Sequence, residues 1–96
     1  MNLLVMYDVN TETKEGRRRL RKVAKKCQCY GQRVQKSVFE CKVDEKEYII
    51  LEKFLSDIID YAKDSIRIYF LSETAVKKIV NIGNAKVIDY EAPLVI

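Results

Sequence analysis

The chain has 96 residues and a net charge of +4, which indicates a single domain with a moderate basic excess. It contains no histidine, which excludes Ser-His-Asp and Cys-His catalysis and any site in which histidine binds zinc. Its three cysteines are an odd number, and we expect no secretory leader, so we predict a cytoplasmic protein without a disulfide framework. Catalysis would therefore use carboxylates, lysine, tyrosine, hydroxyl groups or a metal ion.

The first expected element is an apolar run that ends in a carboxylate. Residues 2–9 read Asn-Leu-Leu-Val-Met-Tyr-Asp-Val, and a run of this length predicts a central β-strand covered on both faces. Asp8 must be solvated, hydrogen-bonded or bound to a cation, because an unpaired buried charge is costly. Two interpretations of Asp8 stay open at this point: a cap for the following helix, or a group that binds a cation or acts as a base.

Residues 13–30 have the pattern of an amphipathic helix with one broad cationic face. Apolar residues recur at i, i+3, i+4 and i+7 from Leu20 to Cys27, and Gly16 on the same stripe predicts a close approach to the sheet. Against the single acid Glu15, such an excess of positive charge favours an anionic partner over a merely solvated face. We expect all eight basic residues to point away from the stripe: Lys14, Arg17, Arg18, Arg19, Arg21, Lys22, Lys25 and Lys26.

The middle of the chain alternates apolar and polar side chains. Gly31 is expected to end the basic helix in the left-handed conformation. Residues 32–43 then predict a half-buried strand kinked near Ser37, or two short strands. Asp44 and Glu47 have the spacing of a capping box, which places the start of a helix at residue 45.

The rest of the chain is expected to complete a sheet. The helix after Asp44 should run to Ala62, with an apolar stripe wider than one sheet face needs. Residues 65–71 predict a strand, residues 73–77 one helical turn, and the segment through Ile82 a further strand. A turn at Gly83 and a last short strand over residues 86–90 should follow, before an apolar tail that packs on another surface.

This order predicts an α+β fold in a single domain, residues 1–96. It matches a ferredoxin-like βαββαβ sandwich with an additional C-terminal strand. Because the helices of such a sandwich cover only one sheet face, we expect two copies to pack sheet to sheet as a two-fold homodimer. The segment 78–96 should then pack on the partner subunit and cover a sheet edge.

Three stretches carry a family resemblance: Tyr7-Asp8-Val9, the basic helix around residues 21–25, and above all the long stretch from Tyr30 to Cys41. In these residues the chain resembles the Cas2 family, the small CRISPR-associated proteins that work beside the CRISPR integrase in spacer acquisition. Residues 67–69 and the turn at residues 81–83 also fit. Gly16 departs from the family, in which a charged residue often stands there.

The resemblance implies a CRISPR adaptation protein that is a metal-dependent endonuclease. It implies a homodimer in which Asp8 of both subunits meet and bind one divalent metal, usually Mg²⁺, so that Asp8 is both catalytic residue and metal ligand. The phosphodiester bonds cleaved would be those of single-stranded RNA or double-stranded DNA. The resemblance also implies a DNA-binding bridge in the spacer-integration complex, with subunits of the CRISPR integrase (Cas1 family) as partners.

The remaining candidate residues have two expected roles. For Phe39 core packing is favoured over a site role, and for Arg33 substrate contact and structural pairing are equally favoured. Two alternative functions stay open: a non-catalytic DNA-binding scaffold for the integrase, and a stand-alone ribonuclease toxin of related fold. The candidates for nucleic-acid binding are Arg17, Arg18, Arg21, Lys22 and Arg33, and those for supporting the site or the dimer are Tyr7, Gln35, Ser37 and Phe39.

Overall fold

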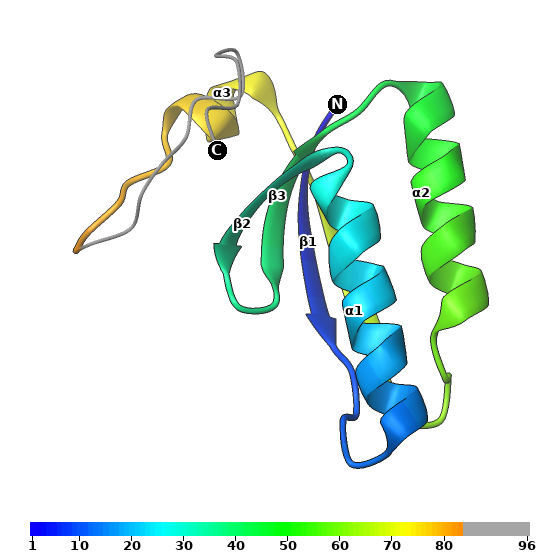
Figure 1. The fold of residues 1–96 in the computed structure, drawn as a ribbon. Coiled ribbons are helices and arrows are strands. Elements are labelled where there is room, and N and C mark those ends of the chain that lie inside the picture. The colour runs from blue at the N-terminus through cyan, green and yellow to red at the C-terminus, as the bar shows by residue number, and fades with distance from the viewer. Residues whose placement is uncertain (84–96) are drawn as a thin grey trace.

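The computed structural model describes residues 1–83 and confirms the predicted α+β fold (Figure 1). The strands form one antiparallel sheet in the order β2-β3-β1-β4, which is the ferredoxin-like arrangement. The elements in chain order are β1 (Asn2–Asp8), α1 (Lys14–Gln28), β2 (Gly31–Gln35), β3 (Val38–Lys42), α2 (Glu45–Ile58), β4 (Ser65–Leu71) and α3 (Glu73–Lys77).

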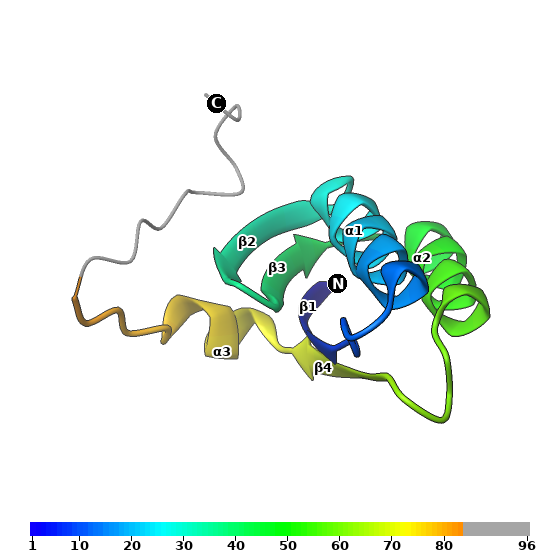
Figure 2. The ribbon, with the colours of Figure 1, turned by 60° about the horizontal axis from the view of Figure 1, so that its bottom comes forward.

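Helices α1 and α2 lie side by side on one face of the sheet, and α3 lies on its other side (Figure 2). The hydrophobic core fills the space between the two long helices and the sheet. Its fully buried side chains come from β1, α1, β3 and α2: Leu3, Val5, Val23, Cys27, Phe39, Cys41 and Leu51.

Within the described part of one chain, β1 is fully covered on one face only, contrary to the expectation from its unbroken apolar run. Successive side chains of a strand point to opposite faces of the sheet. Val5 is fully buried under the helices, whereas Met6 on the open face is 40% exposed. On the open face only the start of β1 is covered, where Asn2 is buried and donates a hydrogen bond to Glu73 of α3. Met6 further along β1 lacks such a cover from the described part of this chain.

Residues 31–42 form two strands, the second of the two predicted alternatives, and Gly31 has a different role from the one expected. Helix α1 ends at Gln28 with Cys29 as a right-handed cap, and Gly31 is the first residue of β2. A Cβ atom at Gly31 would lie 1.9 Å from the carbonyl oxygen of Glu40. Glycine is therefore required there by close packing of β2 on β3, and not by a left-handed turn.

Gly16 also permits a close approach, but to a loop instead of the sheet. A Cβ atom at Gly16 would lie 1.9 Å from the carbonyl oxygen of Asn10, in the connection between β1 and α1. The hydroxyl of Thr13 accepts a hydrogen bond from the amide of Gly16 at 3.0 Å and caps the helix. The first turn of α1 is thus held close against the end of β1.

The capping box at the start of α2 is present, but the helix ends earlier than predicted. The side chain of Asp44 accepts from the amide of Glu47, and the side chain of Glu47 accepts from the amide of Asp44. The helix ends at Ile58 and not at Ala62, because Asp60 turns the chain: its carboxylate accepts a hydrogen bond from the amide of Ala62.

The C-terminal prediction is wrong in part. Helix α3 forms over the predicted residues, but residues 78–83 contain no strand. A strand requires a neighbouring strand, and the expectation relied on a second subunit to supply it. The predicted strand over residues 86–90 and the apolar tail lie outside the described residues.

Candidate functional site

Asp8 ends β1 as an exposed carboxylate that the described part of the chain leaves unpaired. The helix-cap interpretation is wrong, because Thr13 caps α1. The side chain of Asp8 makes no hydrogen bond or ion pair with a described residue, although the residue itself pairs in register with Ser65 of β4. Its carboxylate is therefore free to bind a cation or to accept a hydrogen bond from a ligand.

Asp8 lies in a hollow on the open face of the sheet, which we call the Asp8 hollow. In the register of β1 and β4, Met6 pairs with Arg67 and Asp8 with Ser65, and directly opposed residues share a face. The hollow has a volume of about 280 Å³, and among the described residues that line it Asp8 supplies the only carboxylate. Its lining residues are Met6, Tyr7, Asp8, Ser37, Val38, Ser65, Arg67 and Tyr69.

Three polar residues of this hollow were not among the predicted site residues: Ser65, Arg67 and Tyr69. Arg67 and Tyr69 alternate along β4 on the same face as Asp8, and an Arg67 guanidinium nitrogen donates a hydrogen bond to the Tyr69 hydroxyl at 3.2 Å. Their alternation with the apolar residues of β4 was visible in the sequence. Their position beside Asp8 was not, because it depends on the register between two strands that are far apart along the chain.

The predicted supporting residues divide between the two faces of the sheet. Phe39 is fully buried on the helix-covered face, where its ring stacks with that of Tyr7 at 6.1 Å between centroids. The Arg33 guanidinium lies 5.2 Å from the centroid of the Phe39 ring. Burial raises the pKa of Tyr7, and the charge of Arg33 acts in the opposite direction. Tyr7, Arg33 and Phe39 therefore form one cluster beneath the strand that carries Asp8.

Ser37 and Gln35 lie at different distances from Asp8. The carbonyl of Ser37 accepts a hydrogen bond from the amide of Tyr7 at 3.0 Å, which fixes the β2–β3 turn beside Asp8. Gln35 pairs with Val38 and is exposed on β2, which β3 separates from β1. The structure thus brings Ser37 to the Asp8 hollow and leaves Gln35 outside it.

Helix α1 has a cationic face, but two of its eight basic residues do not belong to it. The guanidinium of Arg19 pairs with the buried carboxylate of Asp64 at 2.7 Å, and the Lys26 ammonium lies 5.0 Å from the centroid of the Phe54 ring. We predicted that all eight point away from the apolar stripe and form one cationic face. These two instead contact α2 and the loop after it, because α1 packs on these elements as well as on the sheet. The exposed members of the cationic face are Lys14, Arg17, Arg18, Arg21, Lys22 and Lys25.

The cationic face and the Asp8 hollow lie on opposite sides of the sheet. Helix α1 covers one face of the sheet (Figure 2), and Val5 is buried on that face. Met6 and Asp8 alternate with Val5 along β1 and line the hollow on the open face. A single chain therefore does not bring Arg17, Arg18, Arg21 or Lys22 to the Asp8 carboxylate.

The donor set at Asp8 fits Mg²⁺ only in part within one chain. Magnesium is usually bound through one or two carboxylates, with water and substrate phosphate as the other ligands. The described residues of one chain contain no group of three or more histidine, cysteine or acidic side chains that could hold a metal ion. One carboxylate per chain fits the ion if a second chain supplies another.

Two further findings concern the chain as a whole. Among residues 1–83, no helix has the length and apolar character needed to cross a membrane. The family model for the CRISPR associated protein Cas2 matches residues 1–79.

Relatives and solved structures agree with this match. The chain is 52% identical over 96 residues to the CRISPR-associated endoribonuclease Cas2 1 of Moorella thermoacetica, covering 100% of both chains. It is 50% identical over 95 residues to the CRISPR-associated endonuclease Cas2 of Halalkalibacterium halodurans, covering 99% of each. The crystal structure of Streptococcus pyogenes Cas2 at pH 6.5 matches with a TM-score of 0.77 and 52% identity, covering 86% of this chain and 100% of that one. The chain therefore belongs to the Cas2 family of CRISPR-associated proteins.

Proposed function

We propose that the protein is a metal-dependent endonuclease of the CRISPR system, with Asp8 of two subunits as its catalytic pair. The observation that carries this proposal is the exposed Asp8 carboxylate, which is unpaired among the described residues and lies in a hollow on the open sheet face. The names of the relatives, endoribonuclease and endonuclease, support the same class of activity.

The open sheet face is the surface through which we expect two copies to associate. It carries apolar and aromatic side chains that remain partly exposed, including Leu4, Met6 and Tyr69. In a two-fold dimer the same patch contacts itself, so the hollow of one subunit would face the hollow of the other. The two Asp8 carboxylates would then approach each other and complete a site that neither chain forms alone.

The residues of the hollow suit hydrolysis of a phosphodiester bond. Mg²⁺, when bound, would activate a water molecule and neutralise charge on the phosphate. Asp8 would bind and orient that ion through its free carboxylate. The Arg67 guanidinium would donate hydrogen bonds to phosphate oxygens, where negative charge increases in the transition state. Tyr69 would hold Arg67 in position through their 3.2 Å hydrogen bond.

A second candidate function is a DNA-binding bridge for the CRISPR integrase. The observation in its favour is the cationic face of α1, which lies on the side of the sheet opposite Asp8. Lysine and arginine contacts to phosphates give affinity without sequence preference. DNA bound there would not need to reach the catalytic carboxylate, so bridging and cleavage are compatible in one protein.

The test compares cleavage and binding in the same samples. Labelled double-stranded DNA and single-stranded RNA are incubated with and without Mg²⁺, using wild type, Asp8→Asn and the control Asp57→Asn, which changes an exposed acid on α2. We expect Mg²⁺-dependent cleavage by wild type and Asp57→Asn, and its loss in Asp8→Asn with binding retained. Cleavage by Asp8→Asn equal to wild type would overturn the role of Asp8. Binding without cleavage by all three proteins would leave the bridging function.

A further inference from the structure

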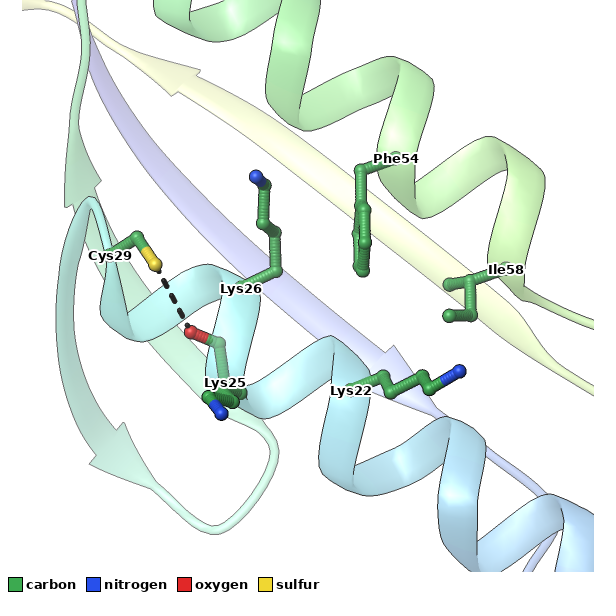
Figure 3. A pocket seen from close by; sticks show the side chains of 6 residues that line it. All are labelled: Lys22, Lys25, Lys26, Cys29, Phe54 and Ile58. Atoms are coloured by element: carbon green, nitrogen blue, oxygen red, sulfur yellow. Dashed lines mark hydrogen bonds between the residues drawn. The ribbon is translucent and has the colours of Figure 1, made fainter.

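A groove between α1 and α2 lies apart from the Asp8 hollow, on the helical side of the protein (Figure 3). We call it the α1–α2 groove. Its volume is about 320 Å³. Phe54 and Ile58 enter it from α2, and three lysines and a cysteine approach it from the α1 side: Lys22, Lys25, Lys26 and Cys29.

The chemistry of this groove combines an apolar floor with positive charge at its rim. Phe54 and Ile58 form the floor, and within residues 1–83 no acidic side chain lines the groove. The Lys26 ammonium lies 5.0 Å from the centroid of the Phe54 ring, so positive charge and an aromatic ring lie next to each other. A matching ligand carries negative charge beside a flat apolar group.

We propose that the α1–α2 groove binds the bases of an unpaired nucleic-acid strand, with its phosphates on the lysines of the rim. This inference rests on the proposed function, since it adds a binding site for the substrate class of the nuclease. Nucleic acids combine the two required features, because each phosphate is anionic and each base has an apolar face that stacks on aromatic rings.

The groove is continuous with the cationic face of α1, which favours a nucleic-acid strand over an isolated small anion. Arg18, Lys22, Lys26 and Cys29 follow one another at spacings of four, four and three residues, so they lie along one side of the helix. At 1.5 Å per residue, Arg18 and Lys26 are about 12 Å apart along the axis. The phosphates of a strand bound along this side would contact several of these positive charges, and one of its bases would contact Phe54.

An unpaired strand fits this groove better than a duplex does. In a duplex the bases are paired and stacked inside the helix, so only phosphates would meet the lysines and the apolar floor would stay empty. An acidic amphipathic peptide would also match the charge of the rim. The nucleic acid is favoured because the chain belongs to a CRISPR-associated family whose relatives are named as nucleases.

Binding can be measured without cleavage by leaving out divalent metal and adding EDTA. The probes are a labelled thymidine oligonucleotide of about twelve nucleotides, an abasic strand of equal length and a duplex of equal length. We expect wild type to bind the thymidine strand at least about 5-fold more tightly than the abasic strand, because stacking contributes to the first only. The variant Phe54→Leu keeps the floor apolar but removes the ring, and it should lose this preference while binding the duplex as before.

The matched control is Phe70→Leu, which changes an aromatic ring on β4 that is 57% exposed and not part of the groove. It should leave all three affinities unchanged. Far-UV circular dichroism establishes that both variants fold. Equal binding of the thymidine and abasic strands by wild type would overturn the proposal. An equal loss of the preference for the thymidine strand in Phe54→Leu and Phe70→Leu would also overturn it.

Cys29 provides a second measurement on the unmodified protein. It lines the groove and is exposed, whereas Cys27 and Cys41 are buried, so iodoacetamide should react with Cys29 first. We expect the thymidine strand to slow this reaction more than the abasic strand or the duplex does. Protection by a glutamate-rich amphipathic peptide but not by the thymidine strand would make the groove a peptide site and refute the proposal. Neither assay involves Asp8, so failure here leaves the nuclease proposal untouched.

Discussion

Asp64 is a buried carboxylate on which the lower end of the helical layer depends, and it permits a quantitative prediction. Its side chain is 0% exposed and accepts hydrogen bonds from Arg19 at 2.7 Å and from the amides of Asp60 and Asn10 at 2.9 and 3.0 Å. The bond from Arg19 is the main reason that the pKa of Asp64 falls from 3.8 to about 2. Desolvation acts against this shift, and the two amides support it.

The shift contributes to stability in a defined pH range. A carboxyl group whose pKa is lower in the folded protein stabilises the fold when it is ionised. A fall from 3.8 to about 2 corresponds to about 2 kcal/mol. This contribution is complete above about pH 5 and is lost as the pH falls through the folded pKa near 2.

The substitution Asp64→Asn removes the charge and keeps the shape of the side chain. At neutral pH we expect it to lower the free energy of unfolding by about 2–4 kcal/mol, because Arg19 loses its partner in a largely buried position. The loss should shrink toward acidic pH, since the wild-type carboxyl then becomes protonated. Urea unfolding at a fixed protein concentration, from about pH 7 down to about pH 2, measures both effects.

The control for this experiment is Asp57→Asn. The Asp57 carboxylate pairs with Lys53 at 3.2 Å, but both side chains are well exposed, so its loss should cost less than about 0.5 kcal/mol at every pH. A penalty for Asp64→Asn that is as small as that of Asp57→Asn, or that does not change with pH, would refute the reasoning.

Two further predictions concern the packing of β2 and the charge of α1. Gly31→Ala should lower the free energy of unfolding by more than about 2 kcal/mol, because its Cβ would lie 1.9 Å from the Glu40 carbonyl oxygen. The control Gly83→Ala should lower it by only about 1 kcal/mol, because the space around Gly83 is open and only its φ of 101° is unfavourable for alanine. Arg18→Gln should reduce the slope of log affinity for DNA against log salt by about 1 without destabilising the fold, whereas Arg19→Gln should destabilise it. Urea unfolding measures the stabilities, and salt titrations of DNA binding measure the slope. Equal stability of the two arginine variants would contradict the assignment of Arg19 to a stabilising ion pair and of Arg18 to the cationic face.

The elements that could be predicted from the sequence are those specified by neighbouring residues. The capping box of Asp44 and Glu47 involves residues three apart, and the periodic apolar residues of α1 require only one helix to form. The contact between Arg19 and Asp64 joins residues 45 apart, and no local pattern pairs them. For this reason Arg19 was assigned to the cationic face, although it forms a stabilising ion pair with the buried Asp64.

The residues alone pointed to one part of the candidate site, Asp8, and the family resemblance added Tyr7 and Ser37, which also line the hollow. Asp8 stands out because a carboxylate ends an apolar run, and only residues adjacent in the sequence are needed to see it. Arg67 and Tyr69 reach the hollow through the register of β1 with β4, which becomes known only when the sheet is formed. The need for glycine at position 31 was hidden for the same reason, because it comes from the backbone of Glu40 on the adjacent strand.

The position of Asp64 also links the two surfaces on which the proposed functions depend. It precedes Ser65, the register partner of Asp8, and it binds both the amide of Asn10 after β1 and the side chain of Arg19 on α1. One buried carboxylate thus fixes the strand end that carries Asp8 relative to the helix that carries the cationic face. Because these surfaces lie on opposite sides of the sheet, nucleic acid held on α1 reaches Asp8 only by passing the end or edge of the sheet, or by contacting another copy. If both surfaces act as proposed, DNA held on α1 would be bound without being cut, and cleavage would require a substrate that enters the open face.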